Sequence, residues 1–121
     1  IGVASTSAYG RPRMSLHQSG IHRAIADLIS LRPPDFSIVD GTVGLQGDSP
    51  MHGSAVPMDL IVAGANPVSV DVVAAAIMGF STAGVEHLVL LGKRGAGQVD
   101  LNRIAVKGST IREVQRTFRR R

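Results

Sequence analysis

Two carboxylates and an imidazole lie in a glycine-rich stretch at residues 38–53, which reads IVDGTVGLQGDSPMHG. Asp40 ends a short apolar run, and ligands in open α/β sheets gather where the chain leaves a strand. Carboxylates can coordinate a hard cation or orient a hydroxyl, an imidazole exchanges a proton near neutral pH, and glycines let backbone N–H groups approach a ligand. We therefore predict a site here, with Asp40 as a catalytic residue. The predicted ligand-binding residues of this loop are Gly41, Gly44, Gly47, Asp48 and His52. In the alternative, Asp40 and Asp48 only cap turns of a surface loop.

Asp71 is a second candidate catalytic residue, because it is the only charge between Asp59 and Glu86 and stands in a nearly all-apolar segment. It would face the cleft between the loop and the helix start as a perturbed carboxylate. In the alternative, a carboxylate near a helix N-terminus is simply favoured by the helix dipole. Asn66, at the start of the same helix, is a predicted ligand-binding residue.

His17 completes the predicted catalytic set. If the first long helix extended back to it, His17 would share a face with Ile21 and point toward the sheet. A metal held by His17, Asp40 and His52 is one option, and the identity of any metal or cofactor stays open. The absence of cysteine excludes disulfides, thiolate zinc sites and a cysteine-ligated iron–sulfur cluster in this chain. The glycine segments match neither known type of phosphate loop.

The elements that would position these residues are helices and short strands. Apolar residues at helical spacing predict a helix from near Ser19 to the prolines at 33–34. Asn66 and Pro67 indicate the start of a helix that Gly79 can end, and Thr110 with Glu113 forms a capping box for a last helix. Short apolar runs predict strands at 36–40, 59–64 and 102–108, and residues 85–94 fit either a helix or a strand. We therefore expect a single α/β domain over residues 1–121, layered, with three to four mostly parallel short strands and flanking helices.

The charge distribution argues against nucleic acid as a partner. Of the net charge of +4, residues 1–111 contribute none, and the excess lies in five arginines of residues 112–121. This pattern is typical of a solvated tail at a helix end. No apolar run is long enough to span a membrane and no secretion signal is present, so we expect a cytoplasmic protein. Because the chain opens IGVAS without Met, we expect a piece of a longer protein.

Four segments carry a family resemblance: LHQSGIHRAIADL, IVDGTVGLQGDSPMHGSAV, LIVAGANPVSVDVVAAAIMGF and HLVLLGKRGAGQVDLNRIAVKG. In this order they resemble the C-terminal half of the domain-of-unknown-function family 362, whose members are often described as iron–sulfur or ferredoxin-like because some carry a fused cluster-binding segment. The resemblance implies that residues 85–94 are helical and that the N-terminal half of the family's domain is missing from this sequence. This chain departs from the family in having Asn66 where Asp is usual and in having no cysteine, so an iron–sulfur cluster does not carry over. The family's activity is not established.

The sequence thus predicts an α/β ligand- or metal-binding module of a redox-associated family, with catalysis left open. The alternative is a non-catalytic scaffold whose open sheet edge pairs with a second copy or with the missing half. A weaker alternative is nucleic-acid binding through Arg112–Arg121.

Overall fold

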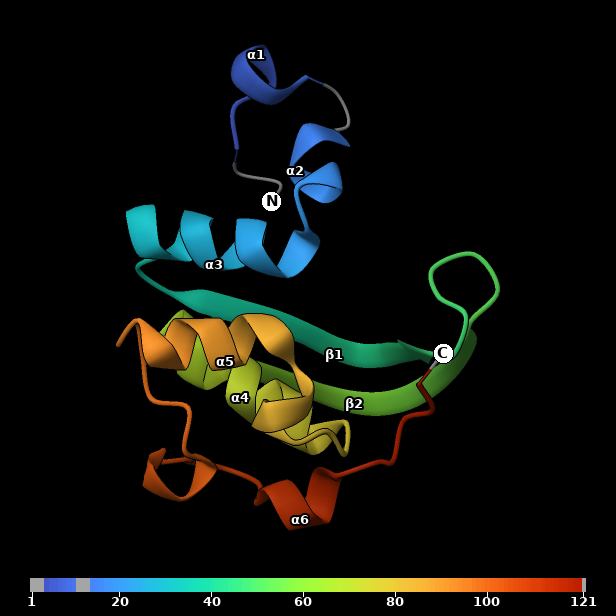
Figure 1. Cartoon of the computed structure of the whole chain (residues 1–121). Helices are drawn as coiled ribbons and strands as arrows, with labels where there is room; N and C mark the ends of the chain where they lie inside the picture. The colour runs from blue at the N-terminus through green and yellow to red at the C-terminus, as the bar shows by residue number, and fades with distance from the viewer. Residues whose placement is uncertain (1–3, 11–13, 121) are drawn as a thin grey trace.

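A computed structural model of the chain describes residues 4–10 and 14–120 (Figure 1). Two antiparallel strands and a set of helices make up the described part. The elements in chain order are α1 (Thr6–Tyr9), α2 (Met14–Gln18), α3 (Ile21–Leu31), β1 (Ser37–Gln46), β2 (Ser54–Gly64), α4 (Pro67–Ile77), the 3-10 turn Thr82–Gly84, α5 (Glu86–Lys93), the 3-10 turn Leu101–Arg103 and α6 (Ile111–Val114).

The sheet is a single hairpin, so the prediction of three to four mostly parallel strands is wrong. β1 pairs with β2 in antiparallel register from Ser37 opposite Gly64 to Gln46 opposite Ser54. The register shifts by one residue between Gly41 and Val43, near Asp59, which has a positive φ of 52°. A hairpin needs only a short connection, whereas parallel strands need a crossover. The predicted glycine loop is therefore limited to residues 47–53 at the tip of the hairpin, because β1 extends to Gln46 and β2 begins at Ser54.

The glycines inside β1 make room for neighbouring side chains. A Cβ on Gly41 would lie 2.5 Å from the Leu60 Cδ1 atom, and one on Gly44 would lie 2.7 Å from the Phe118 Cε2 atom. These two glycines belong to the inner face of the hairpin, and Phe118 is buried there with 5% of its surface exposed. Their spacing therefore has a packing reason, which the sequence alone did not separate from a ligand-binding one.

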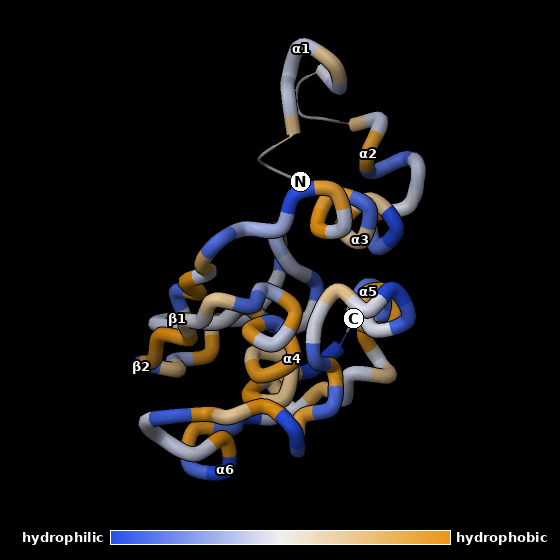
Figure 2. Tube along the Cα trace, turned by 90° about the vertical axis from the view of Figure 1, so that its left-hand side faces the viewer, coloured by the Kyte–Doolittle hydropathy of each residue, from blue (hydrophilic) through white to orange (hydrophobic). Residues whose placement is uncertain are grey.

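α4 packs against the hairpin, and α3 and α5 pack with α4 to form the core. Figure 2 shows the sheet, α4 and α5 following one another across the molecule, with α3 beside α5. Asn66 caps α4 and Pro67 stands at its first turn, as predicted, and Gly79 follows its end with a φ of 80°. The buried core cluster joins α3, α4 and α5 and contains Ala26, Val68, Val72, Ala75, Leu88 and Leu91. The helix implied at residues 85–94 is confirmed as α5.

The chain after α5 is mostly irregular. The Thr110–Glu113 capping box is present, but α6 ends at Val114. Beyond it, the backbone N–H groups of Arg116 and Phe118 donate to the carbonyls of Ile77 and Met78 at 2.9 and 3.0 Å, so the tail is bonded to the end of α4. In Figure 1 the tail runs from α6 back to the far end of the hairpin.

The predicted strand at 102–108 is also wrong. Its residues form the 3-10 turn Leu101–Arg103 and then an irregular segment, with Ile104 at φ −98° and ψ 121°. Ile104 has strand-like angles, but Gly108 has a positive φ of 93°, and no strand among the described residues pairs with this segment.

Among the described helices, none has both the length and the apolar character that crossing a membrane requires.

Candidate functional site

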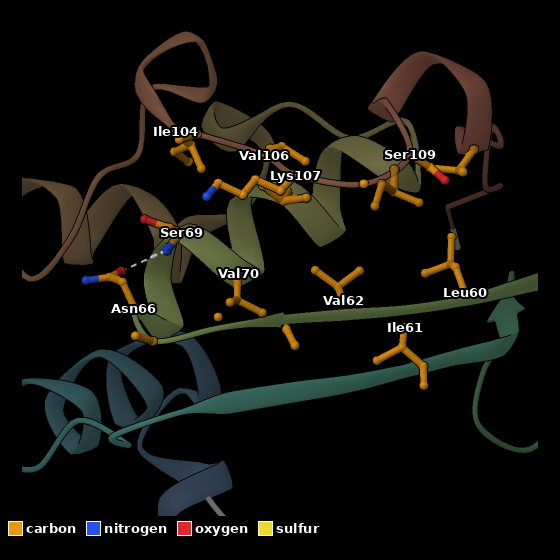
Figure 3. Close-up of a pocket in the computed structure, with 18 of the residues that line it drawn as sticks. Leu60, Ile61, Val62, Asn66, Ser69, Val70, Ile104, Val106, Lys107 and Ser109 are labelled. Carbon is orange, nitrogen blue, oxygen red and sulfur yellow. Dashed lines mark hydrogen bonds between the residues drawn. The ribbon is translucent and has the colours of Figure 1, made fainter.

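A groove of about 770 Å³ separates the free edge of β2 from residues 103–109. Consecutive residues of β2 from Asp59 to Gly64 line one wall, and Arg103 to Ser109 line the other. The floor is α4, which contributes Ser69, Val70, Val73 and Ile77. Figure 3 shows Val62 and Val70 facing this space across from Ile104 and Val106. The middle of the groove is therefore apolar.

One end of the groove is polar and positively charged. Asn66 lies there, and its Oδ1 atom accepts a hydrogen bond of 2.9 Å from the backbone N–H of Ser69. In Figure 3 the amine of Lys107 points toward the end where Asn66 and Ser69 lie. Arg103 lines the same wall as Lys107, and neither forms an ion pair with any described residue. This end therefore combines two unpaired cations with an amide and a hydroxyl.

Two glycines shape that end of the groove. A Cβ on Gly64 would lie 2.8 Å from the Val70 Cγ2 atom, and one on Gly97 would lie 2.5 Å from the Asn66 Oδ1 atom. Their missing side chains let β2 and the loop after α5 approach the start of α4 closely. The Ser69 hydroxyl donates to the carbonyl of Gln98 at 3.4 Å and helps to hold that loop.

The structure does not bring the predicted catalytic residues together. Asp40 is exposed in β1, and its Oδ1 atom accepts hydrogen bonds from the hydroxyl and the N–H of Thr42 at 2.6 and 2.9 Å. The Thr42 hydroxyl first, and then its N–H, hold the pKa of Asp40 below the ordinary value of 3.8. Because α4 packs on the inner face of the hairpin, the Asp40 side chain points away from Asp71.

Asp71 belongs instead to a chain of polar contacts across three helices. Its Oδ2 atom lies 3.5 Å from the Nε2 atom of His87 on α5, and the Nδ1 atom of His87 lies 3.2 Å from that of His22 on α3. Half of the Asp71 side chain is exposed, but only 16% of that of His87. The two imidazole planes are 15° apart. The N–H of one imidazole can donate to the unprotonated nitrogen of the other. These contacts therefore tie α3 and α4 to α5.

His17 lies apart from this network. It is exposed in α2, and Gly20, with a φ of 96°, separates α2 from α3. His17 therefore does not share the α3 face with Ile21.

The remaining predicted residues lie at the tip of the hairpin. Asp48 and His52 line a small cavity of about 260 Å³, together with Gly47, Arg119 and Arg120. The tail forms one side of this open cavity, and the N–H of Gly47 donates to the carbonyl of Arg119 at 3.1 Å. Arg119 also donates to the Ser54 hydroxyl at 3.1 Å, and the Arg120 guanidinium lies 4.9 Å from the centre of the Phe80 ring. Two of the tail arginines are thus held within the molecule.

Of the predicted site residues, Asn66 alone lines the large groove. The residues that the sequence analysis missed there are Ser69, Gln98, Arg103 and Lys107. A usable signal was present, because Arg103 and Lys107 flank the short apolar run Ile104–Val106. Within the described residues, no group of three or more histidine, aspartate and glutamate side chains is placed to hold a metal ion.

The family model for the domain of unknown function DUF362 matches residues 1–76. The chain belongs to the DUF362 family. The matched part ends within α4, so it contains the hairpin and one wall of the groove, whereas Arg103 and Lys107 lie beyond it. A search of the curated proteins and a search of the solved structures each gave no match.

Proposed function

We propose that this DUF362 chain is a binding module whose groove along β2 takes an anionic ligand with an apolar body. The observation that carries the proposal is the pairing of an apolar groove with two unpaired cations at one end. Arg103 and Lys107 line the groove together with Asn66 and Ser69, and Figure 3 shows the Lys107 amine directed toward the end where Asn66 and Ser69 lie. Pockets of a few hundred Å³ or more, apolar and with a few converging polar groups, are the usual form of ligand sites.

The chemistry of the groove sets the class of ligand. A carboxylate or phosphate would receive charge-assisted hydrogen bonds from Arg103 and Lys107. An alkyl or branched apolar portion would lie against Val62, Val70 and Val106. A cation is disfavoured at this end, because the acidic lining residue, Asp59, lies at the other end of the strand.

A matched pair of probes tests the proposal. Octanoate and octylammonium have the same apolar chain and opposite charges. We expect octanoate to bind, as measured by isothermal titration calorimetry, and octylammonium to bind at least about tenfold more weakly. Lys107→Ala should weaken octanoate binding by about tenfold, since a hydrogen bond to a charged group contributes about 1.5–3 kcal/mol when it is well desolvated and less when it is exposed.

Lys93→Ala is the control, because Lys93 is an exposed lysine at the end of α5 outside the groove. It should leave the affinity unchanged. Equal binding of the two probes, or an equal loss in both variants, would refute the proposal.

A second candidate function is self-association through the outer face of the hairpin. Ile38 and Ile61 are each 70% exposed on that face, and Val43 and Leu45 of β1 are also exposed. An uncovered apolar sheet face of this kind is typical of an interaction surface. Sedimentation velocity over a range of concentrations should show a dimer that Ile38→Lys abolishes. Leu31→Lys is the control, because Leu31 is 82% exposed on α3 and not on the sheet. A monomer at all concentrations would exclude this function.

A further inference from the structure

We infer that the ligand of the groove is an extended polypeptide segment that adds to the free edge of β2 and places its C-terminal carboxylate beside Lys107. This inference rests on the proposed function, because it uses the same groove and the same cations. It goes further in naming the ligand as a peptide bound through its backbone.

The first support is that the groove exposes the edge of β2 rather than one of its faces. Side chains of a strand alternate between two faces, so a cavity over one face is lined by every second residue. Here all six residues from Asp59 to Gly64 line the groove in succession. β2 pairs with β1 alone, so half of its backbone N–H and C=O groups point away from β1 along this edge.

The opposite wall has the same character. The segment leaves the 3-10 turn with extended angles at Ile104, and within the described part of the chain no backbone hydrogen bond joins residues 104–109 to β2. Its residues line the groove without interruption from Arg103 to Ser109. The edge of β2 is thus left without a backbone partner on this side, which is the setting that strand addition requires.

The dimensions suit a short peptide. Six residues from Asp59 to Gly64 extend over about 17 Å at a rise of about 3.3 Å per residue. A peptide of five or six residues would therefore match the edge. Its alternate side chains would meet Val62 and Val70 on the side of α4.

The charges fix the direction of the peptide. Lys107 points to the Asn66 end of the groove, and Asp59 lines the end where this part of β2 begins. A terminal carboxylate is attracted to the first end and repelled from the second. The peptide would therefore run parallel to β2, with its C-terminus next to Lys107.

The probe is the peptide acetyl-Val-Thr-Val-Thr-Val with a free carboxylate, compared with its C-terminal amide and with a version N-methylated at alternate residues. We expect the free acid to bind and to slow hydrogen exchange of the amides of Asp59–Gly64. Amidation should weaken binding about tenfold in the unaltered chain and clearly less in Lys107→Ala, where Arg103 is the remaining cation of the groove. N-methylation should weaken it at least about tenfold, because backbone hydrogen bonds are lost. Lys93→Ala should behave as the unaltered chain.

The outcomes separate the two claims. If octanoate binds and the peptide does not, or if the N-methylated peptide binds as well as its parent, the inference of strand addition is wrong and the proposed function stands. If neither octanoate nor the peptide binds, both are wrong. An amide that binds as tightly as the free acid contradicts the placement of the carboxylate beside Lys107.

Discussion

The substitution Gly44→Ala tests whether the glycines of β1 serve packing. A Cβ at this position would lie 2.7 Å from the Cε2 atom of Phe118, which is closer than carbon atoms approach without displacement. Phe118 is 95% buried and cannot keep its place. Burial of a phenylalanine side chain stabilises a fold by about 1.5–3 kcal/mol, and overpacking costs about 1–3 kcal/mol. We expect Gly44→Ala to lower the free energy of unfolding by about 2 kcal/mol.

A double-mutant cycle identifies the cause of that loss. With Phe118→Ala as background, the ring is gone and the new methyl group has space. Alanine in a strand interior is then favoured over glycine by about 0.5–1 kcal/mol, so Gly44→Ala should become stabilising. The assay is urea denaturation of the four proteins, analysed as a cycle.

If Gly44→Ala still lowers the free energy of unfolding in the Phe118→Ala background, the packing argument is wrong. This result would mean that Gly44 is required for its backbone conformation or for a contact other than the ring. Tryptic cleavage at Arg116 and Arg119 gives a second readout. Gly44→Ala should accelerate it, because the N–H groups of Arg116 and of Phe118 itself hold the tail to the end of α4.

Three further predictions concern the polar contacts. Asn66→Ala removes the cap of α4 and should cost about 1 kcal/mol in urea denaturation, whereas Asn66→Asp, which keeps the acceptor, should cost little. His87→Ala should cost about 1–2 kcal/mol and accelerate tryptic cleavage at Arg23 on α3, because the contacts to both Asp71 and His22 are lost. His52→Ala, at an exposed histidine, should have neither effect. Thr42→Val should raise the pKa of Asp40 toward 3.8 in a carboxyl NMR titration. The Asp40 carboxylate contributes stability above its unfolded pKa, and this stability is lost as the pH falls through its lower folded pKa. The contribution should therefore become smaller in Thr42→Val. An unchanged Asp40 titration would show that Thr42 does not set that pKa.

The local signals of the sequence were reliable where short-range chemistry decides the structure. Asn66, Pro67 and the Thr110–Glu113 pair specify helix starts through hydrogen bonds within a few residues, and each does so in the structure. The family resemblance supplied the helix at 85–94, where periodicity was ambiguous.

The sheet could not be predicted in the same way, because strand pairing depends on contacts far apart in the sequence. The short apolar run at 36–40 gave no sign that β1 would continue through Gly41 and Gly44 to meet residues of β2. Those glycines are needed by Leu60 and Phe118, the second of which is more than seventy residues away. The candidate site was only partly predictable for the same reason. Asn66 could be recognised from the helix start that it caps. Arg103 and Lys107 become part of a site only when residues 103–109 lie opposite β2.

Mapping octanoate on the unaltered chain by ¹H–¹⁵N NMR tests the proposed groove most directly. We expect chemical-shift changes that saturate together at Ser69, at Val62 and at Lys107, which lie on three sides of the groove. Changes confined to the arginine-rich residues 112–120, or no saturable change in the groove, would contradict it.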